Sequence, residues 1–335
     1  MFEVDADIRK AKTLPSEFYT DGRFFEISRE KIFGPAWHFL GQSGDFESLK
    51  PATLLPGFLD EPILLSRVGE EVNCFSNVCT HRGKILVEEP CKASLIRCGY
   101  HGRRFSLDGK FLSMPEFEGV ENFPSEADDL TKLPLAEWKG FLFASIDPFS
   151  VFADVVADVP DIGFEYSTLK QTSTNEYEIA AHWALYCENY LEGFHIPYVH
   201  KSLNEIVDYG TYTTETFRYA NVQTGFDDAG IVAAKYLFIF PNLMFNFYPW
   251  GVSVNIVRPV GPSKSVVEFL TYVADESLIE KSAGADLHGV EMEDEAVVES
   301  VQRGIRSRFY SHGRYSPTRE QGTHHFHRLI AEFVE

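Results

Sequence analysis

Two short stretches in the first third of the chain contain side chains that bind metals in proteins. Cys79 and His81 make the first pair, and Cys98 and His101 make the second, with sixteen residues between His81 and Cys98. Thiolate and imidazole ligands of this kind bind either a structural zinc ion or an iron–sulfur cluster. The residue types alone do not decide between these two kinds of site.

The spacing favours the cluster over zinc. Each stretch contributes one cysteine and one histidine, whereas structural zinc sites usually pair cysteine with cysteine and histidine with histidine. A [2Fe-2S] cluster with two cysteines on one iron and two histidines on the other is the Rieske arrangement. Gly83 and Gly102 follow the pairs and permit tight turns. Cys74, Cys91 and Cys187 match no ligand position, and we expect them to be buried thiols.

A second group of candidate ligands lies about ninety residues beyond the first, in CENYLEGFHIPYVH. Glu192 and His195 are three residues apart, which would place them on one face of a helix. His200 follows five residues later, and on an unbroken helix its ring would diverge from that of His195. A break at Pro197 would bring the two imidazoles together. They would then need one carboxylate to form an iron site with open positions.

The stretch GVEMEDEAVVESVQRGIRS supplies the carboxylate, in a long helix that we expect from about Asp286 to Phe309. Asp294 falls on the valine face, where an uncompensated carboxylate costs on the order of several kcal/mol and a metal removes that cost. Glu293 is the fallback, with poorer helical phasing. The expected stripes are a solvated one of Glu291, Glu295 and Glu299 and a buried one of Val290, Val297, Val298 and Val301.

The rest of the sequence predicts an α+β protein. An early helix is expected to begin after Asp21 and to end near Gly34. Short strands and turns from Trp37 to Ile146, with a turn at Asp108-Gly109, predict a small all-β domain. The domains are therefore expected at residues 36–147, and at residues 1–35 with 148–335, where an antiparallel sheet would pack against the long helix.

The motifs CTHRG and CGYHG resemble the two ligand loops of the Rieske domain. With EGFHIPYVH and Asp294, they make nearly the full chain similar to the oxygenase (alpha) component of the Rieske non-haem iron oxygenases. The branch with choline and carnitine monooxygenases looks most similar. One departure is Arg103, because many relatives have tryptophan after the glycine of the second loop.

The resemblance implies a Rieske [2Fe-2S] domain and a helix-grip-type catalytic domain. It implies that His195, His200 and Asp294 bind a mononuclear Fe(II), which activates O2, and that Glu192 bridges the two metal sites. Subunits of this family usually form a homotrimer, in which the cluster of one subunit feeds the iron of its neighbour.

The expected function is the oxygenase component of a multicomponent monooxygenase that hydroxylates a small organic molecule. No Gly-x-Gly-x-x-Gly motif occurs, so NAD(P)H would act only through a separate flavin or ferredoxin-type reductase. Attack on an N-bound carbon would cause demethylation or C–N cleavage. Two alternatives remain open, an aromatic ring-hydroxylating dioxygenase alpha subunit and a Rieske electron-transfer protein without catalysis.

The substrate is only weakly indicated by the sequence. Phe245, Phe247 and Trp250 are candidates for the pocket, where aromatic faces would suit a quaternary ammonium group or an apolar carbon skeleton. His182 is expected to be a packing residue. The histidines of HHFH (residues 324–327) would be a surface tail or a packing surface for a partner, rather than a third metal site.

Composition and charge exclude several classes of partner. The 335 residues carry a formal net charge of −20, which argues against nucleic acid and against anionic membrane surfaces. No stretch approaches the length of a membrane span, and the N-terminus lacks the apolar core of a signal peptide. We therefore expect a cytoplasmic protein.

Overall fold

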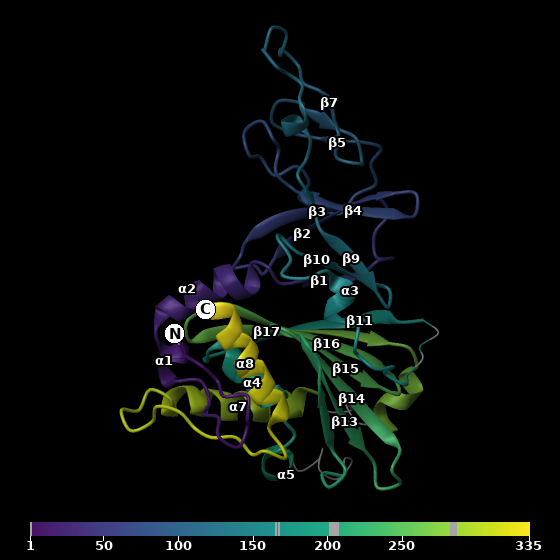
Figure 1. The fold of residues 1–335 in the computed structure, drawn as a ribbon. Helices are drawn as coiled ribbons and strands as arrows, with labels where there is room; N and C mark the ends of the chain where they lie inside the picture. The colour runs from purple at the N-terminus through teal and green to yellow at the C-terminus, as the bar shows by residue number, and fades with distance from the viewer. Residues whose placement is uncertain (1, 165, 167, 201–207, 282–286) are drawn as a thin grey trace. The chain divides into compact units, whose positions relative to one another are not determined.

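The computed structural model describes residues 2–164, 166, 168–200, 208–281 and 287–335 (Figure 1). Its chain divides into two compact units, residues 34–149 and residues 1–33 with 150–335. The first unit is built of small antiparallel sheets, and the second has a larger antiparallel sheet with helices. The expected α+β class is confirmed.

Three small sheets form the unit from residue 34 to residue 149, with the orders β1-β10-β9, β2-β3-β4-β8 and β5-β6-β7. The expected hairpins are present, and Gly109 has a φ of +82° in the turn between β6 and β7. The elements are β1 (His38–Gln42), β2 (Leu49–Leu54), β3 (Glu61–Val68), β4 (Glu71–Ser76), β5 (Ile96–Arg97), β6 (Arg104–Phe105), β7 (Phe111–Ser113), the 3₁₀ helix η2 (Glu126–Asp128), β8 (Lys132–Leu133), β9 (Leu135–Trp138) and β10 (Phe141–Ala144).

Strand β3 is buried on both faces, and one of these faces supports the cysteine loops. Ile63 and Leu65 belong to one hydrophobic core, whereas Leu64 between them belongs to a second core. That second core also contains Cys79 and Cys98. The alternation of side chains along a strand therefore directs one row of β3 toward the two loops.

The N-terminal segment forms α1 (Ser16–Thr20), α2 (Gly22–Ser28) and the π-helix η1 (Arg29–Phe33). The expected cap is confirmed, because the Asp21 side chain accepts a hydrogen bond from the backbone N–H of Arg23 over 2.9 Å. Ile32 and Phe33 are fully buried, as the apolar pattern predicts.

A seven-stranded antiparallel sheet forms the centre of the other unit, in the order β11-β17-β16-β15-β14-β13-β12. Residues directly opposite one another on neighbouring strands share a face of a sheet. Gln223, Tyr236 and Asn246 therefore lie on one face, because Gln223 pairs with Tyr236 and Tyr236 pairs with Asn246. The strands are β11 (Lys170–Ile179), β12 (Thr213–Thr216), β13 (Ala220–Phe226), β14 (Val232–Ile239), β15 (Leu243–Tyr248), β16 (Gly251–Gly261) and β17 (Lys264–Val273).

Helix α4 (Trp183–Tyr190) packs against α7, α8 and β16, and Figure 1 shows these helices gathered beside the sheet. His182 caps α4 through Nδ1, which accepts from the backbone N–H of Ala184 over 3.3 Å. Burial lowers the pKa of His182 to about 3, in keeping with a packing residue. The other helices are α3 (Phe152–Val155), α5 (Ile196–Val199), η3 (Glu276–Lys281), α7 (Leu287–Gly304) and α8 (Gln321–Val334).

Helix α7 is the expected long helix, but its buried face differs from the predicted one. It ends at Gly304 rather than near Phe309, and the expected start at Asp286 lies outside the described residues. Glu291 is 3 % exposed and Val301 is 43 % exposed, so the predicted stripes are wrong at these two positions, whereas Val298 is buried as predicted. The buried line is Glu291, Val298, Gln302 and Ile305.

The C-terminal histidines lie on α8, so the predicted surface tail is also wrong. His324 and His327 are buried, and Nδ1 of His327 lies 2.6 Å from Oη of Tyr315. Nε2 of His327 lies 3.1 Å from Oε1 of Glu188, which also accepts a hydrogen bond from Oη of Tyr19 over 2.7 Å. This network joins the N-terminal segment and α8 to α4.

Two further findings concern the surface. Cys91 is exposed, contrary to expectation, whereas Cys74 and Cys187 are buried as expected. Within the described ranges, no helix combines the length and apolar character needed to cross a bilayer.

Candidate metal centres

The two cysteine–histidine loops have the same backbone hydrogen bonds. The N–H of Cys79 donates to the carbonyl of Lys84 over 2.8 Å, and the N–H of Gly83 donates to the carbonyl of Cys79 over 3.0 Å. In the second loop, Cys98 and Gly102 make the equivalent bonds, at 2.8 and 3.1 Å. Gly83 and Gly102 have φ values of +69° and +75°, a region that glycine adopts readily. Each loop is thus a tight turn that begins at its cysteine.

The four predicted ligands of these loops lie together. Cys79 and Cys98 are buried in the same core, and the backbone N–H of Tyr100 donates to Sγ of Cys98 over 3.5 Å. The imidazole rings of His81 and His101 are 4.8 Å apart between centroids. Nδ1 of His101 is buried without a hydrogen-bond partner among the described residues. A buried ring nitrogen without a partner, beside two thiols and a second imidazole, fits the mixed ligand set of a Rieske cluster.

Glu192 and His195 do not share a helix, contrary to the prediction. Helix α4 ends at Tyr190, and both residues lie in the connection to the short helix α5. Pro197 is therefore in the first turn of α5 instead of kinking a continuous helix. His195 and His200 are the residues at the two ends of α5, and this single turn brings their rings together.

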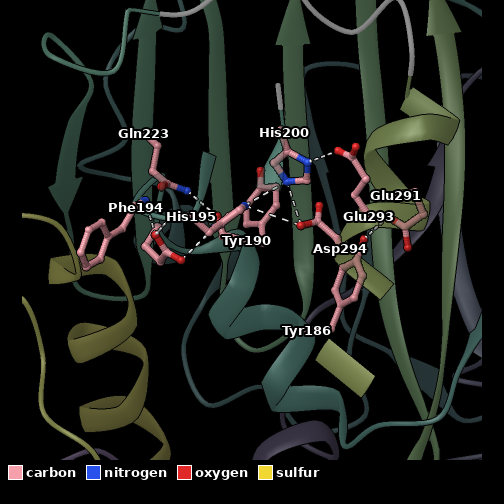
Figure 2. A network of polar contacts seen from close by, with 10 residues as sticks. Tyr186, Tyr190, Phe194, His195, His200, Gln223, Glu291, Glu293 and Asp294 are labelled. Atoms are coloured by element: carbon pink, nitrogen blue, oxygen red, sulfur yellow. Dashed lines mark hydrogen bonds and ion pairs between the residues drawn. The ribbon is translucent and has the colours of Figure 1, made fainter. Parts of the chain in front are cut away.

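His195, His200 and Asp294 converge on one point (Figure 2). Nε2 of His195 lies 3.1 Å from Nε2 of His200, which lies 2.9 Å from Oδ1 of Asp294. The three ligand atoms are within 4.8 Å of one another, and His200 is only 1 % exposed. Two imidazoles and one carboxylate fit the facial triad of a mononuclear iron.

A further carboxylate lies behind each histidine. Nδ1 of His195 lies 2.8 Å from Oε1 of Glu192, and Nδ1 of His200 lies 2.7 Å from Oε2 of Glu293. Each Nδ1–H therefore donates to a carboxylate, which leaves both Nε2 atoms free to bind a metal. Glu293, the fallback ligand of the sequence, contacts Nδ1 of His200, whereas Asp294 contacts Nε2. Desolvation would lower the pKa of His200, but Asp294 and Glu293 outweigh it and raise the pKa.

A buried acid lies one turn before Asp294 on α7. Oη of Tyr186 donates to Oε2 of Glu291 over 2.5 Å, and Oε1 of Glu291 has no hydrogen-bond partner among the described residues. Burial raises the pKa of Glu291 to about 8, and the negative charges of Asp294 and Glu295 contribute. Glu291 is therefore largely protonated at neutral pH.

Two of the three predicted pocket residues do not face the histidines. Gln223 donates from Nε2 to the carbonyl of Tyr190 over 2.7 Å, so the face of the sheet with Gln223 is the one that α4 covers. Phe245 and Phe247 alternate with Asn246 of that face and point to the other side. The prediction is therefore wrong for Phe245 and Phe247.

Tyrosines that the sequence did not single out lie on the face of the sheet that α4 covers. The Tyr190 ring lies 6.4 Å from that of Tyr236, which lies 6.2 Å from that of Tyr248, and Trp250 stacks on Tyr248 at 5.0 Å. Burial raises the pKa of Tyr236 to about 12, so its phenol stays neutral. Trp250 thus remains a candidate for the pocket. Separate strands supply these rings, and only the sheet register brings them together.

Comparison with known proteins identifies the family. The family model Rieske [2Fe-2S] domain matches residues 36–124, and Ring hydroxylating alpha subunit (catalytic domain) matches residues 210–335. Chloroplastic choline monooxygenase of Arabidopsis thaliana is 32% identical over 98% of this chain and 84% of its own length. The chain belongs to the Rieske non-haem iron oxygenases, as an oxygenase (alpha) component.

Other members of the family support the same assignment. The carnitine monooxygenase oxygenase subunit of Escherichia coli (strain K12) is 29% identical over 98% of this chain and 95% of its own length. A crystal structure of the quaternary ammonium Rieske monooxygenase CntA matches with a TM-score of 0.85 and 25% identity, over 100% of both chains. The protein is therefore the oxygenase component of a Rieske monooxygenase, with a [2Fe-2S] cluster, a mononuclear iron and O2 as co-substrate. It is neither an electron carrier alone nor a ring dioxygenase.

Proposed function

We propose that this oxygenase hydroxylates a C–H bond next to nitrogen in a small quaternary ammonium compound. The relatives are named for choline, carnitine and quaternary ammonium compounds. The observation that carries the proposal in this chain is the aromatic cluster of Tyr190, Tyr236, Tyr248 and Trp250. Tyr190 is two residues before Glu192, whose carboxylate lies 2.8 Å from Nδ1 of His195. Neutral aromatic faces attract a quaternary ammonium group by about 0.5–2 kcal/mol each.

We assign the roles of the metal ligands as follows. Cys79, Cys98, His81 and His101 would hold the cluster, and His195, His200 and Asp294 would hold the mononuclear iron. When bound, the cluster supplies single electrons and the iron supplies the activation of O2. The chain's own contribution is geometric, because Glu192 and Glu293 fix the histidine rings and the tyrosines would hold the substrate's methyl groups near them.

Electron transfer between subunits is proposed on two supports. Inter-subunit electron transfer is described for a quaternary ammonium Rieske monooxygenase of similar structure, and family analogy gives a homotrimer. Glu192 is 15 % exposed at its side chain and contacts His195 through Oε1, while Oε2 accepts from the N–H of Phe194 and of His195. We propose that Glu192 links His195 to a cluster histidine of the adjacent subunit.

The remaining partners follow from the same reasoning. We propose that a separate flavin or ferredoxin-type reductase supplies electrons from NAD(P)H, and that the protein works in the cytoplasm. Units 34–149 and 1–33 with 150–335 would be the cluster domain and the catalytic domain.

The test uses the reconstituted holoenzyme with a generic reductase and three candidate substrates, choline, carnitine and γ-butyrobetaine. Each is compared with its isostere in which carbon replaces the quaternary nitrogen. We expect coupled NADH consumption and product with at least one cation, and at least tenfold lower kcat/KM for the matching neutral isostere. Equal turnover of the cation and its isostere would contradict the proposed substrate class.

A further inference from the structure

We propose that Arg103, with its partner Asp128, positions the two ligand loops of the cluster and sets the reduction potential of the cluster. The inference rests on the cluster, which follows from family membership, and does not depend on the substrate proposed above. Arg103 follows Gly102 directly, and its carbonyl accepts the hydrogen bond from Cys98 that closes the second loop. Its backbone is therefore part of the cluster loop.

The side chain of Arg103 fastens that loop to a neighbouring segment. Nη2 donates to Oδ1 of Asp128 over 2.6 Å and to the carbonyl oxygen of Asp128 over 3.2 Å. The Asp128 carboxylate also accepts from the N–H of Ser125 over 2.8 Å, which fixes its orientation. Arg103 is 2 % exposed, so this ion pair is protected from solvent screening on the arginine side.

The same carbonyl oxygen of Asp128 holds the first loop. Oγ1 of Thr80 donates to it over 2.9 Å, and Thr80 lies between the ligands Cys79 and His81. One backbone acceptor thus receives a donor from each loop, Thr80 from the first and Arg103 from the second. Loss of either donor would loosen one loop relative to the other.

The guanidinium is a permanent charge in an apolar surrounding. Its central carbon lies 5.7, 4.9 and 5.6 Å from the ring centroids of Phe105, Phe111 and Phe123. Nε is buried without a hydrogen-bond partner among the described residues. The charge lies beside the first ligand loop, because Nη2 of Arg103 and Oγ1 of Thr80 donate to the same carbonyl oxygen of Asp128.

The electrostatic consequence has a definite sign. Reduction adds one negative charge to the cluster, so a nearby cation favours the reduced form and a nearby anion opposes it. Removal of the Arg103 charge must therefore lower the midpoint potential, and removal of the Asp128 charge must raise it. If the pair only held the loops together, the two substitutions would not shift the midpoint potential in opposite directions.

The experiment is a redox titration of the holoenzyme, followed by the electron paramagnetic resonance signal of the reduced cluster. For Arg103→Gln, we expect the ratio of reduced to oxidised cluster at a fixed potential to fall by about tenfold, or 59 mV for a one-electron couple. For Asp128→Asn, we expect the ratio to rise. Arg103→Lys keeps the charge, so its ratio of reduced to oxidised cluster should stay within about threefold of the wild-type ratio. The control Arg104→Gln should also stay within this range, because the Arg104 side chain is exposed.

The positioning part has its own readout, the rate at which the cluster's visible absorbance decays on warming. Thr80→Val removes one fastening without a change in charge, so decay should be several-fold faster while the midpoint potential is retained. If Arg103→Gln does not retain its cluster, the shift of the midpoint potential in Asp128→Asn alone tests the electrostatic role. An unchanged potential in both Arg103→Gln and Asp128→Asn, or shifts in the same direction, would overturn the electrostatic role. Wild-type decay in Thr80→Val would overturn the positioning role.

Discussion

His200 donates its Nδ1 hydrogen to Oε2 of Glu293 over 2.7 Å, on the side of the ring away from Asp294. Glu293 and Asp294 are adjacent on α7, yet they contact opposite nitrogens of one imidazole. Glu293 therefore fixes the tautomer and the ring orientation, while Asp294 shares the metal position (Figure 2). We propose that Asp294 binds the iron and that Glu293 orients His200.

The Glu293→Gln variant tests this division. The amide can accept from Nδ1–H but lacks the charge, so we expect about tenfold weaker binding of the mononuclear iron and an unchanged cluster spectrum. Competition with a chelator, followed by iron analysis, measures the affinity. Glu276→Gln is the matched control, since Glu276 is an exposed glutamate of η3. Wild-type iron affinity in Glu293→Gln would remove the proposed role.

The His195→Ala variant separates the two metal centres. We expect it to lose the mononuclear iron and all turnover, because one of three ligands is gone, while the cysteine–histidine loops keep their cluster. Visible absorption and iron analysis of the same sample provide the comparison. Disappearance of the cluster spectrum would show that the ligands are divided wrongly between the centres.

The Glu192→Gln variant tests the bridge. Both metals should remain bound, but turnover should fall by about 100-fold, because the amide cannot accept from Nδ1 of His195 and from the backbone amides equally well. Single-turnover measurements with the cluster reduced beforehand report the transfer step. Normal transfer in this variant would place the electron path elsewhere.

The pH dependence of stability should include a contribution from Glu291. Its pKa is raised from 4.5 to about 8, so between these values the folded chain binds a proton that the unfolded chain has lost. The contribution of Glu291 to the free energy of unfolding is therefore fully present below about pH 4.5. It falls as pH rises toward 8, by at most about 1.4 kcal/mol per pH unit. Glu291→Gln should flatten this part of the profile. Parallel profiles of thermal unfolding for both proteins would contradict the buried, protonated acid.

Substitutions on the two sides of the sheet test the role of the aromatic cluster. Tyr190→Leu removes a ring beside the histidines and should raise KM for a quaternary ammonium substrate by about 2- to 30-fold, whereas Tyr190→Phe should change it little. Phe247→Leu is the control on the opposite face and should leave KM unchanged. A larger change in KM for the Phe247 variant than for the Tyr190 variant would place the substrate on the opposite face of the sheet and contradict the proposal.

The sequence predicts which candidate ligands lie together, because the spacing within each cysteine–histidine pair is local. Cys79 to His81 and Cys98 to His101 each lie in one tight turn, and the turn alone determines their spacing. Hydrophobic periodicity failed on α7, since its buried line includes Glu291 and Gln302, which satisfy polar partners on other elements. A rule that places only apolar residues inward cannot find polar residues that are buried on the same helix face as apolar ones.

Long-range pairing explains the other errors. Phe245 and Phe247 are as aromatic as Tyr236 and Tyr248, and only the register of β14 and β15 decides which pair lies beside α4. The end of α4 at Tyr190 carries no proline or glycine signal in the sequence before Gly193. Both features depend on tertiary contacts that no short window of sequence contains.

The most direct test of the whole account is metal and sulfide analysis of protein purified without oxygen, combined with electron paramagnetic resonance after mild reduction. The account predicts roughly three irons and two acid-labile sulfides per chain, with the signal of a cluster ligated by two cysteines and two histidines. Two irons, all in the cluster, would contradict the second centre at His195, His200 and Asp294. The absence of the mixed-ligand signal would contradict the first.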